Sequence, residues 1–125
     1  GNPVCCAAAL ATLDVVEGGA MANAAVQGER LLAGARALME KHRCIGDVRG
    51  LGLMVGIEFV KDRATREPDG DLVHRIVELA FSRGLLLLGA GKSALRLAPP
   101  LVIDAVDIDR GVAMIDACIE EALKG

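Results

Sequence analysis

The sequence predicts an α+β fold, in which a small three- to four-stranded mixed or antiparallel sheet carries helices on one face. The first reason is the order of periodic segments along the chain, which reads α-α-β-α-β-β-α. The second is length, because 125 residues without internal repeats fit one domain spanning residues 1–125. The third is composition: 53% of residues are hydrophobic and 2% aromatic, and small side chains suit close helix packing.

The first helix is expected to run from Pro3 to about Glu17. Asn2 can cap its free backbone N–H groups, Pro3 suits the first helical position, and Gly18 follows its end. Its body, VCCAAALATLDVV, is apolar almost all the way round. A helix without a polar face is typically buried on several sides, and a domain of this size offers few places to bury one. We therefore expect a partner surface outside this chain.

An amphipathic helix over residues 21–42 and a strand over residues 53–60 follow. Glu58 is the one charge in that strand, and glycines at 50, 52 and 56 indicate bends or close backbone approaches. The polar stretch 61–70 predicts a solvated loop, and residues 71–82 predict a helix.

Two strands are expected around residues 85–88 and 94–97, separated by the turn GAGKS at 89–93. Either Asp104 or Asp107 can cap a last helix that runs to about residue 123.

Composition argues against several classes of partner. A net charge of −3, a pI near 5.3 and scattered basic residues disfavour nucleic-acid binding. No uninterrupted apolar run reaches the roughly 20 residues that span a bilayer, so no membrane role is expected. The four cysteines have neither zinc-site spacing nor the density of a disulfide scaffold. We interpret all four as buried, reduced thiols of a cytoplasmic protein.

Two local patterns do not predict a binding site. The GKS of residues 91–93 is not a phosphate-binding loop, because that motif needs Gly five residues before Gly91, where Leu86 stands, and a helix afterwards. His42 and His74 have no Cys or carboxylate at ligand spacing, so we expect solvated or structural roles and no metal site.

Arg96 is the residue most suggestive of a function. It is embedded in the apolar strand ALRL, where an unpaired arginine is costly. It is therefore either paired within the protein, with Glu58 as the favoured partner, or kept for an anionic ligand such as a carboxylate. Local sequence leaves both possibilities open.

Four motifs in order resemble the C-terminal segment of the class-III, pyridoxal-phosphate-dependent aminotransferases. They are GNPV at 1–4, IGDVRGLGLMVGIEFV at 45–60, RGLLLL at 83–88 and ALRLAPPLVI at 94–103. The likeness is to 4-aminobutyrate and acetylornithine or ornithine aminotransferases, and it covers the whole chain. It implies the small domain of a fold-type I enzyme that moves an amino group from an amino acid to a 2-oxo acid. It also implies a missing large domain and a homodimer.

The resemblance assigns a role to Arg96, before Pro99-Pro100, as the group that grips the substrate carboxylate. It brings Gly1 and Asn2 nearest to the cofactor, since in the family they follow a Thr that reaches the cofactor phosphate of the partner subunit. It places no catalytic or cofactor-binding residue in this chain, and none of its lysines lies in a matching motif: Lys41, Lys61, Lys92 and Lys124. We therefore expect the isolated chain to be inactive. The alternative is a non-catalytic α+β binding or dimerisation module.

Overall fold

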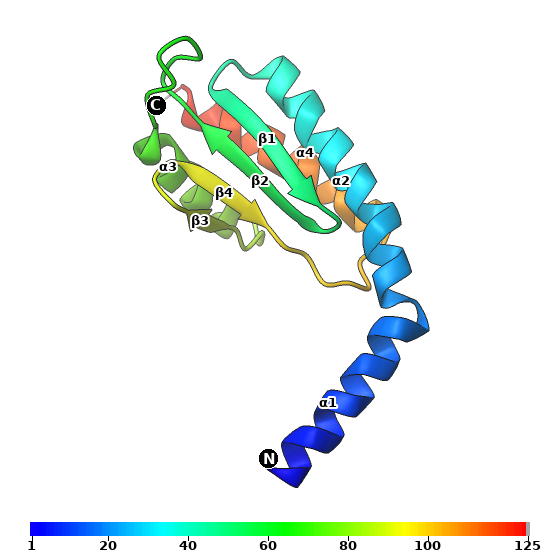
Figure 1. Cartoon of the computed structure of the whole chain (residues 1–125). Helices are drawn as coiled ribbons and strands as arrows, with labels where there is room; N and C mark the ends of the chain where they lie inside the picture. The colour runs from blue at the N-terminus through cyan, green and yellow to red at the C-terminus, as the bar shows by residue number, and fades with distance from the viewer. Residues whose placement is uncertain (125) are drawn as a thin grey trace.

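A four-stranded antiparallel sheet forms the centre of the protein. In the computed structural model, which describes residues 1–124, its strands lie in the order β1-β2-β4-β3 (Figure 1). The strands are β1 (Ile45–Leu51), β2 (Met54–Phe59), β3 (Leu88–Ala90) and β4 (Ala94–Leu97). All three neighbouring pairs are antiparallel.

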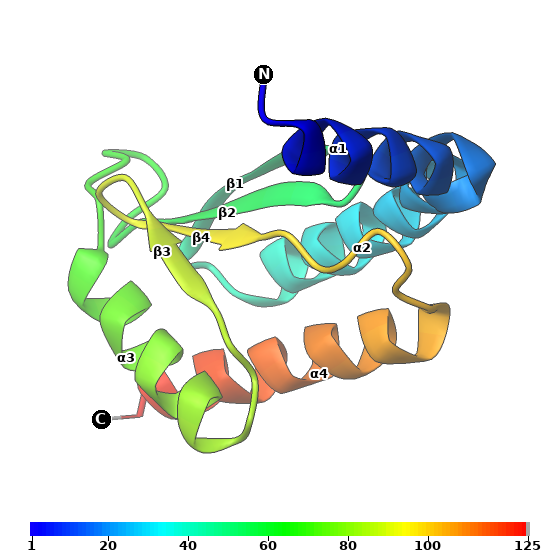
Figure 2. The same cartoon turned by 90° about the horizontal axis from the view of Figure 1, so that it is seen from below.

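Three helices cover one face of this sheet, as the view from below shows (Figure 2). They are α2 (Met21–Lys41), α3 (Gly70–Ser82) and α4 (Ala105–Ala122). Side chains start two of them: Asp69 Oδ1 accepts from the backbone N–H of Leu72 at 3.0 Å, and Asp104 Oδ1 accepts from that of Asp107 at 2.9 Å. The predicted α+β fold with helices on one face is confirmed. The uncovered face is called the open face below.

The core lies between the sheet and these helices. Alternate strand residues point into it, including Val55, Ile57 and Phe59 of β2 and Leu95 and Leu97 of β4. They pack in one cluster with apolar residues of all three helices. The intervening strand residues therefore lie on the open face.

Two strand predictions were wrong. The stretch around residues 45–51 was not expected to be a strand, yet it forms β1 and pairs with β2 along its length. Only Ile45 and Val48 of its residues are buried, so its alternation is weak. The strand expected at 85–88 begins instead at Leu88 and extends into the predicted turn. Pairing with a neighbouring strand, rather than local apolar content, decided both boundaries.

A tight turn joins β1 to β2 where the helix α2 passes closest to the sheet. Gly52 in this turn has φ +54°, which favours glycine. A Cβ added to Gly28 of α2 would overlap the backbone carbonyl group of Gly52. Two glycines thus allow helix and turn to touch backbone to backbone.

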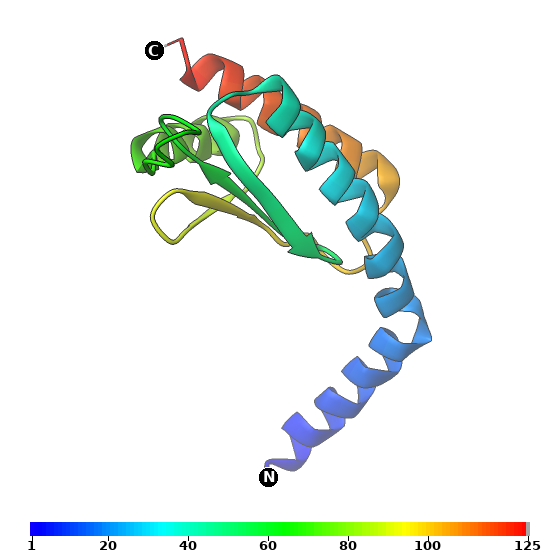
Figure 3. The same ribbon diagram turned by 45° about the horizontal axis from the view of Figure 1, so that its top comes forward.

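The helix α1 (Pro3–Val15) projects away from the rest of the protein (Figures 1 and 3). It joins α2 through a π-helical turn, Val16–Ala20, in which Gly19 has φ 146°. Every residue of α1 is exposed, so the expectation of burial on several sides is not met within the part of the chain described. Apart from the adjoining segment Val16–Ala20, no helix or strand among residues 1–124 packs on α1, and its apolar surface is uncovered.

By length and composition alone, the helical segment Pro3–Lys41 would suffice to cross a membrane. Its most apolar 18-residue window has a mean hydropathy of 1.5, and little of it is buried. This differs from the expectation drawn from uninterrupted apolar runs, because a windowed average tolerates isolated polar residues such as Thr12 and Asp14. Length and composition are weak grounds for a membrane span.

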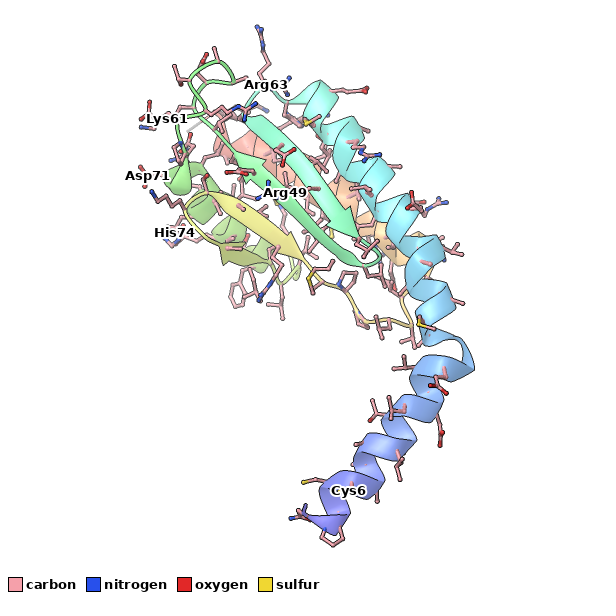
Figure 4. The ribbon with its side chains drawn as sticks, viewed as in Figure 1. Cys6, Arg49, Lys61, Arg63, Asp71 and His74 are labelled. Atoms are coloured by element: carbon pink, nitrogen blue, oxygen red, sulfur yellow. The ribbon has the colours of Figure 1, made fainter. Side chains whose placement is uncertain are left out.

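The cysteine prediction was correct for one residue. All four are free thiols, but Cys5 and Cys6 are exposed on α1, Cys44 is half-buried and Cys118 is buried. Figure 4 shows Cys6 on the projecting helix. The predicted burial of Cys5 and Cys6 was wrong for the same reason as the predicted burial of α1. Both predictions assumed a covering surface that residues 1–124 do not supply.

Candidate functional site

Arg96 lies on the open face of the sheet. Its strand neighbours Leu95 and Leu97 point into the core, so the alternation of β4 turns the guanidinium to the opposite side. The premise that Arg96 is buried among apolar groups was therefore wrong: it is exposed in this chain. The strand β4 is apolar only on the face that the helices cover.

The predicted partner of Arg96 is engaged elsewhere. Glu58 Oε2 accepts a hydrogen bond from Arg49 Nη1 at 2.7 Å, and Asp47 binds the same nitrogen. These hydrogen bonds, that of Glu58 first, raise the pKa of Arg49 above its ordinary value. Figure 4 shows Arg49 over the open face. Among residues 1–124, no side chain or carbonyl forms a hydrogen bond or ion pair with the guanidinium of Arg96.

A glycine separates the two arginines. In the register of the sheet, Gly56 of β2 pairs with Arg49 on one side and with Arg96 on the other, and Leu88 of β3 follows Arg96. A Cβ built on Gly56 would meet just one neighbouring atom within 4 Å, the carbonyl oxygen of Arg49 at 3.8 Å. The surface between the arginines is therefore shallow and unfilled, with room for a small anionic group.

An apolar pocket adjoins Arg96. It has a volume of about 420 Å³ and lies where the chain before β3 and the chain after β4 meet α4. Its lining is mostly aliphatic and includes three residues of charged type, Arg96, Asp107 and Arg110. Because α2 and α4 line this pocket, it lies on the helix-covered side of the sheet, whereas the side chain of Arg96 is on the open face.

The chain after Arg96 is tied to α2. Asn23 Nδ2 donates to the carbonyl oxygens of Leu101 at 2.7 Å and Ile103 at 3.0 Å. The preceding residues, Pro99 and Pro100, have restricted backbone dihedrals. The strand end that carries Arg96 is thus held by prolines and a side-chain anchor.

Neither Arg49 nor Arg110 was predicted from the sequence. Arg49 lies two residues after Asp47 in β1, which is antiparallel to the strand of Glu58. This position would have indicated an ion pair with Glu58 if β1 had been predicted as a strand. Arg110 lies on α4, 14 positions after Arg96, and no local pattern connects the two.

The lysines do not resemble a carbonyl-reactive amine. Lys41 is bound by Asp116 and Glu120, and Lys61 by Glu67; these hydrogen bonds raise the pKa of both ammonium groups. A lysine that attacks a carbonyl needs its pKa lowered instead. The other two lysines are exposed: Lys92 and Lys124.

The remaining sequence candidates have structural surroundings. Asn2 accepts from the backbone N–H of Val4 at 2.9 Å and so caps α1, while Gly1 is exposed. The GKS of residues 91–93 lies at the β3–β4 connection, with no helix after it. No group of three or more His, Cys, Asp or Glu suited to a metal was found among residues 1–124.

The two histidines differ in their surroundings. His42 is buried and lies 2.5 Å from Asp116, whereas His74 is exposed beside Glu78. Burial opposes ionisation of Asp116, but hydrogen bonds from Lys41 and His42 outweigh this effect and hold its pKa below the ordinary value. His42 therefore joins the end of α2 to α4, which is the structural role expected for it.

The chain is similar in sequence to several enzymes of known function. The chain is 41% identical over 124 residues to the 5-aminovalerate aminotransferase DavT of Pseudomonas aeruginosa, covering 97% of this chain and 29% of that protein. It is 42% identical over 125 residues to the 4-aminobutyrate aminotransferase GabT of Escherichia coli, covering 98% and 29%. It is 41% identical over 117 residues to an isoleucine 2-epimerase of Lentilactobacillus buchneri, covering 93% and 26%. The chain thus spans less than a third of these relatives.

Solved structures share the fold. An aminotransferase of Bacillus anthracis superposes with a TM-score of 0.91 at 34% identity, covering 96% of this chain and 28% of that one. An amine transaminase from an uncultivated Pseudomonas species, in its PLP-bound internal aldimine form, gives 0.87 at 35% identity, covering 94% and 27%. The family model described as aminotransferase class-III matches residues 1–119. The chain belongs to the class-III aminotransferase family.

Proposed function

We propose that this chain is the C-terminal, substrate-capping domain, residues 1–125, of a pyridoxal-phosphate-dependent transaminase. The parent enzyme moves an amino group from an amino acid such as 4-aminobutyrate or (acetyl)ornithine to a 2-oxo acid. The observation that carries the proposal is the guanidinium of Arg96, which is exposed on the open face and has no hydrogen-bond or ion-pair partner among residues 1–124. Arg96 binds the substrate carboxylate there, in a two-pronged geometry that a guanidinium favours.

The cofactor belongs to the remainder of the parent. Pyridoxal phosphate needs a lysine for its aldehyde, and the lysines of this chain are either ion-paired or exposed. The residues described here do not fit a cofactor site, so we assign this chain no step on the cofactor. Gly1 and Asn2 stay the residues nearest to it by family resemblance, and the isolated chain is expected to be inactive.

The exposed surface of α1 supports the same assignment. Every residue of this apolar helix is exposed in the chain described. Such a helix is stable in water only when another protein surface covers it. We propose that the large domain of the parent and the second subunit of a homodimer provide this cover, in a cytoplasmic enzyme. A non-catalytic dimerisation module would leave α1 covered too, but would give Arg96 no substrate to bind.

Substitution of Arg96 in the complete enzyme tests the proposal. Arg96→Met should lower kcat/KM for 5-aminopentanoate about 100-fold, since a desolvated carboxylate loses its charged partner. Activity with pentylamine, which has no carboxylate, is the matched control and should change little. Equal effects on both amines, or none on either, would refute the role of Arg96.

The reaction itself is tested by its products. Formation of an amino acid from the 2-oxo acid indicates transamination, whereas inversion of the amino acid without transfer would match the epimerase relative instead. Absorbance of the isolated chain mixed with pyridoxal phosphate should show no internal aldimine band that survives dialysis.

A further inference from the structure

The open face holds two arginines that stand in similar positions around one carboxylate. Glu58 on β2 pairs in register with Asp47 on β1 and with Ala94 on β4. Arg49 and Arg96 each lie two residues further along those neighbouring strands, and both pair in register with Gly56. Diagonal neighbours of this kind are within reach of long side chains on the same face of a sheet.

Glu58 binds one of these arginines and not the other. Its Oε2 atom lies 2.7 Å from Nη1 of Arg49. Asp47 contacts the same nitrogen, so Arg49 is held from both sides. The side chain of Glu58 retains 39% exposure and is not locked in place by burial. Its carboxylate is thus engaged by Arg49, and no hydrogen bond or ion pair joins it to Arg96 in the part of the chain described.

We infer that Arg49 is a positioning residue, which occupies Glu58 and thereby keeps Arg96 free for the substrate carboxylate. This inference rests on the proposed role of Arg96 in substrate binding. Without Arg49, Glu58 would turn to Arg96 and compete with the substrate from within the protein. Asp47 supports the arrangement by holding the guanidinium of Arg49 beside Glu58.

The competition has a defined kinetic consequence. A protein whose binding-competent form is partly populated binds its ligand more weakly in proportion to that fraction. Exposed ion pairs are modest in strength, so an Arg96–Glu58 pair would reduce carboxylate binding about fivefold. The effect falls on KM, because Glu58 competes with substrate binding and not with later steps.

The test uses four variants of the complete enzyme: Arg49→Met, Glu58→Gln, the double variant of both, and Arg49→Lys. The probes are 5-aminopentanoate as donor, pentanoate as competitive inhibitor and pentylamine as a donor without a carboxylate. In Arg49→Met, KM for 5-aminopentanoate and Ki for pentanoate should rise about fivefold while kcat and the pentylamine kinetics stay near wild-type values. Arg49→Lys should remain close to wild type, because an ammonium group can still hold Glu58.

Rescue is the decisive measurement. The double variant should return KM and Ki to near wild-type values, because a neutral glutamine does not compete for Arg96. A structural role of Arg49 would leave the double variant as impaired as Arg49→Met, and that result would overturn the inference. An unchanged Ki in Arg49→Met would overturn it as well.

Failure of the underlying proposal looks different. If Arg96→Met leaves Ki for pentanoate unchanged, the carboxylate role of Arg96 fails, whatever the Arg49 variants do. If Arg96→Met weakens the binding of pentanoate and Arg49→Met does not, the proposed function stands and the positioning role of Arg49 is refuted.

Discussion

Filling the space at Gly56 should separate substrate binding from stability. Gly56→Val places a branched side chain between Arg49 and Arg96. The backbone tolerates the change, since an added Cβ meets just the carbonyl oxygen of Arg49 at 3.8 Å, an ordinary contact. Valine also favours strands and lacks the conformational freedom of glycine in the unfolded chain. We therefore expect the free energy of unfolding to rise by about 0.5 kcal/mol or stay unchanged.

The effect on carboxylate substrates should be the opposite. Gly56 pairs in register with Arg96, so under the proposed role of Arg96 the methyl groups of the introduced valine would crowd a carboxylate bound beside it on the open face. Replacing a direct charged hydrogen-bond pair by a more distant contact costs about 1.5–3 kcal/mol of binding free energy. This corresponds to a roughly 10- to 150-fold loss in kcat/KM. Steady-state kinetics of the complete enzyme with 5-aminopentanoate and pentylamine measure it, and pentylamine should be affected much less.

Gly89→Val is the matched control. Gly89 is also a strand glycine with room for a Cβ, whose nearest neighbour would be Val73 Cγ1 at 3.8 Å. It pairs with Leu95 and so lies on the helix-covered face, away from Arg96. A folded Gly56→Val enzyme with wild-type kcat/KM for 5-aminopentanoate, or an equal loss in Gly89→Val, would show that the carboxylate does not lie over Gly56.

Three further predictions concern the scaffold. Gly28→Ala should destabilise the protein by about 1–3 kcal/mol in denaturant unfolding, because the new methyl group overlaps the backbone of Gly52; a neutral result would contradict the close approach. Phe59→Ala should cost about 3–5 kcal/mol by the same assay, since Phe59 is fully buried, and a cost below about 1 kcal/mol would place it outside the core. Asp116 has a lowered pKa in the fold, so its stabilisation is present above the ordinary carboxylate range and is lost as pH falls through the lowered value. Asp116→Asn should therefore flatten the decline of the unfolding free energy between about pH 5 and pH 3, and an unchanged slope would argue against the contacts of Asp116 with Lys41 and His42.

Helix positions were largely predictable because their signals are local. Asp104 caps α4 as one of the two predicted alternatives, and the periodicity over residues 71–82 matches α3 to within one residue. The sheet was harder to predict. The strand β1 contains two glycines and exposes Asp47 and Arg49, so it becomes a strand through its pairing with β2.

The candidate site was half predictable for a related reason. The motif around Arg96 predicts a substrate-binding role, which stays a prediction. The surroundings of Arg96 depend on which sheet face the helices cover, and no local pattern states this. The prediction that Glu58 pairs with Arg96 was wrong. The partner is Arg49, which lies on the strand that the sequence reading missed.

Under the proposed role of Arg96, the anchor formed by Asn23 would lower the entropic cost of binding a carboxylate. The two hydrogen bonds of Asn23 and the adjacent prolines restrict the chain that follows Arg96 before any ligand arrives. A carboxylate bound by Arg96 would then freeze few additional backbone torsions, so more of its interaction energy would be retained as affinity. The same anchor joins the strand of Arg96 to α2, whose helix continues through the bend at Gly19 into α1. A change in the tilt of α1 within the complete enzyme would thus alter the mobility of the Arg96 strand end without touching the guanidinium itself.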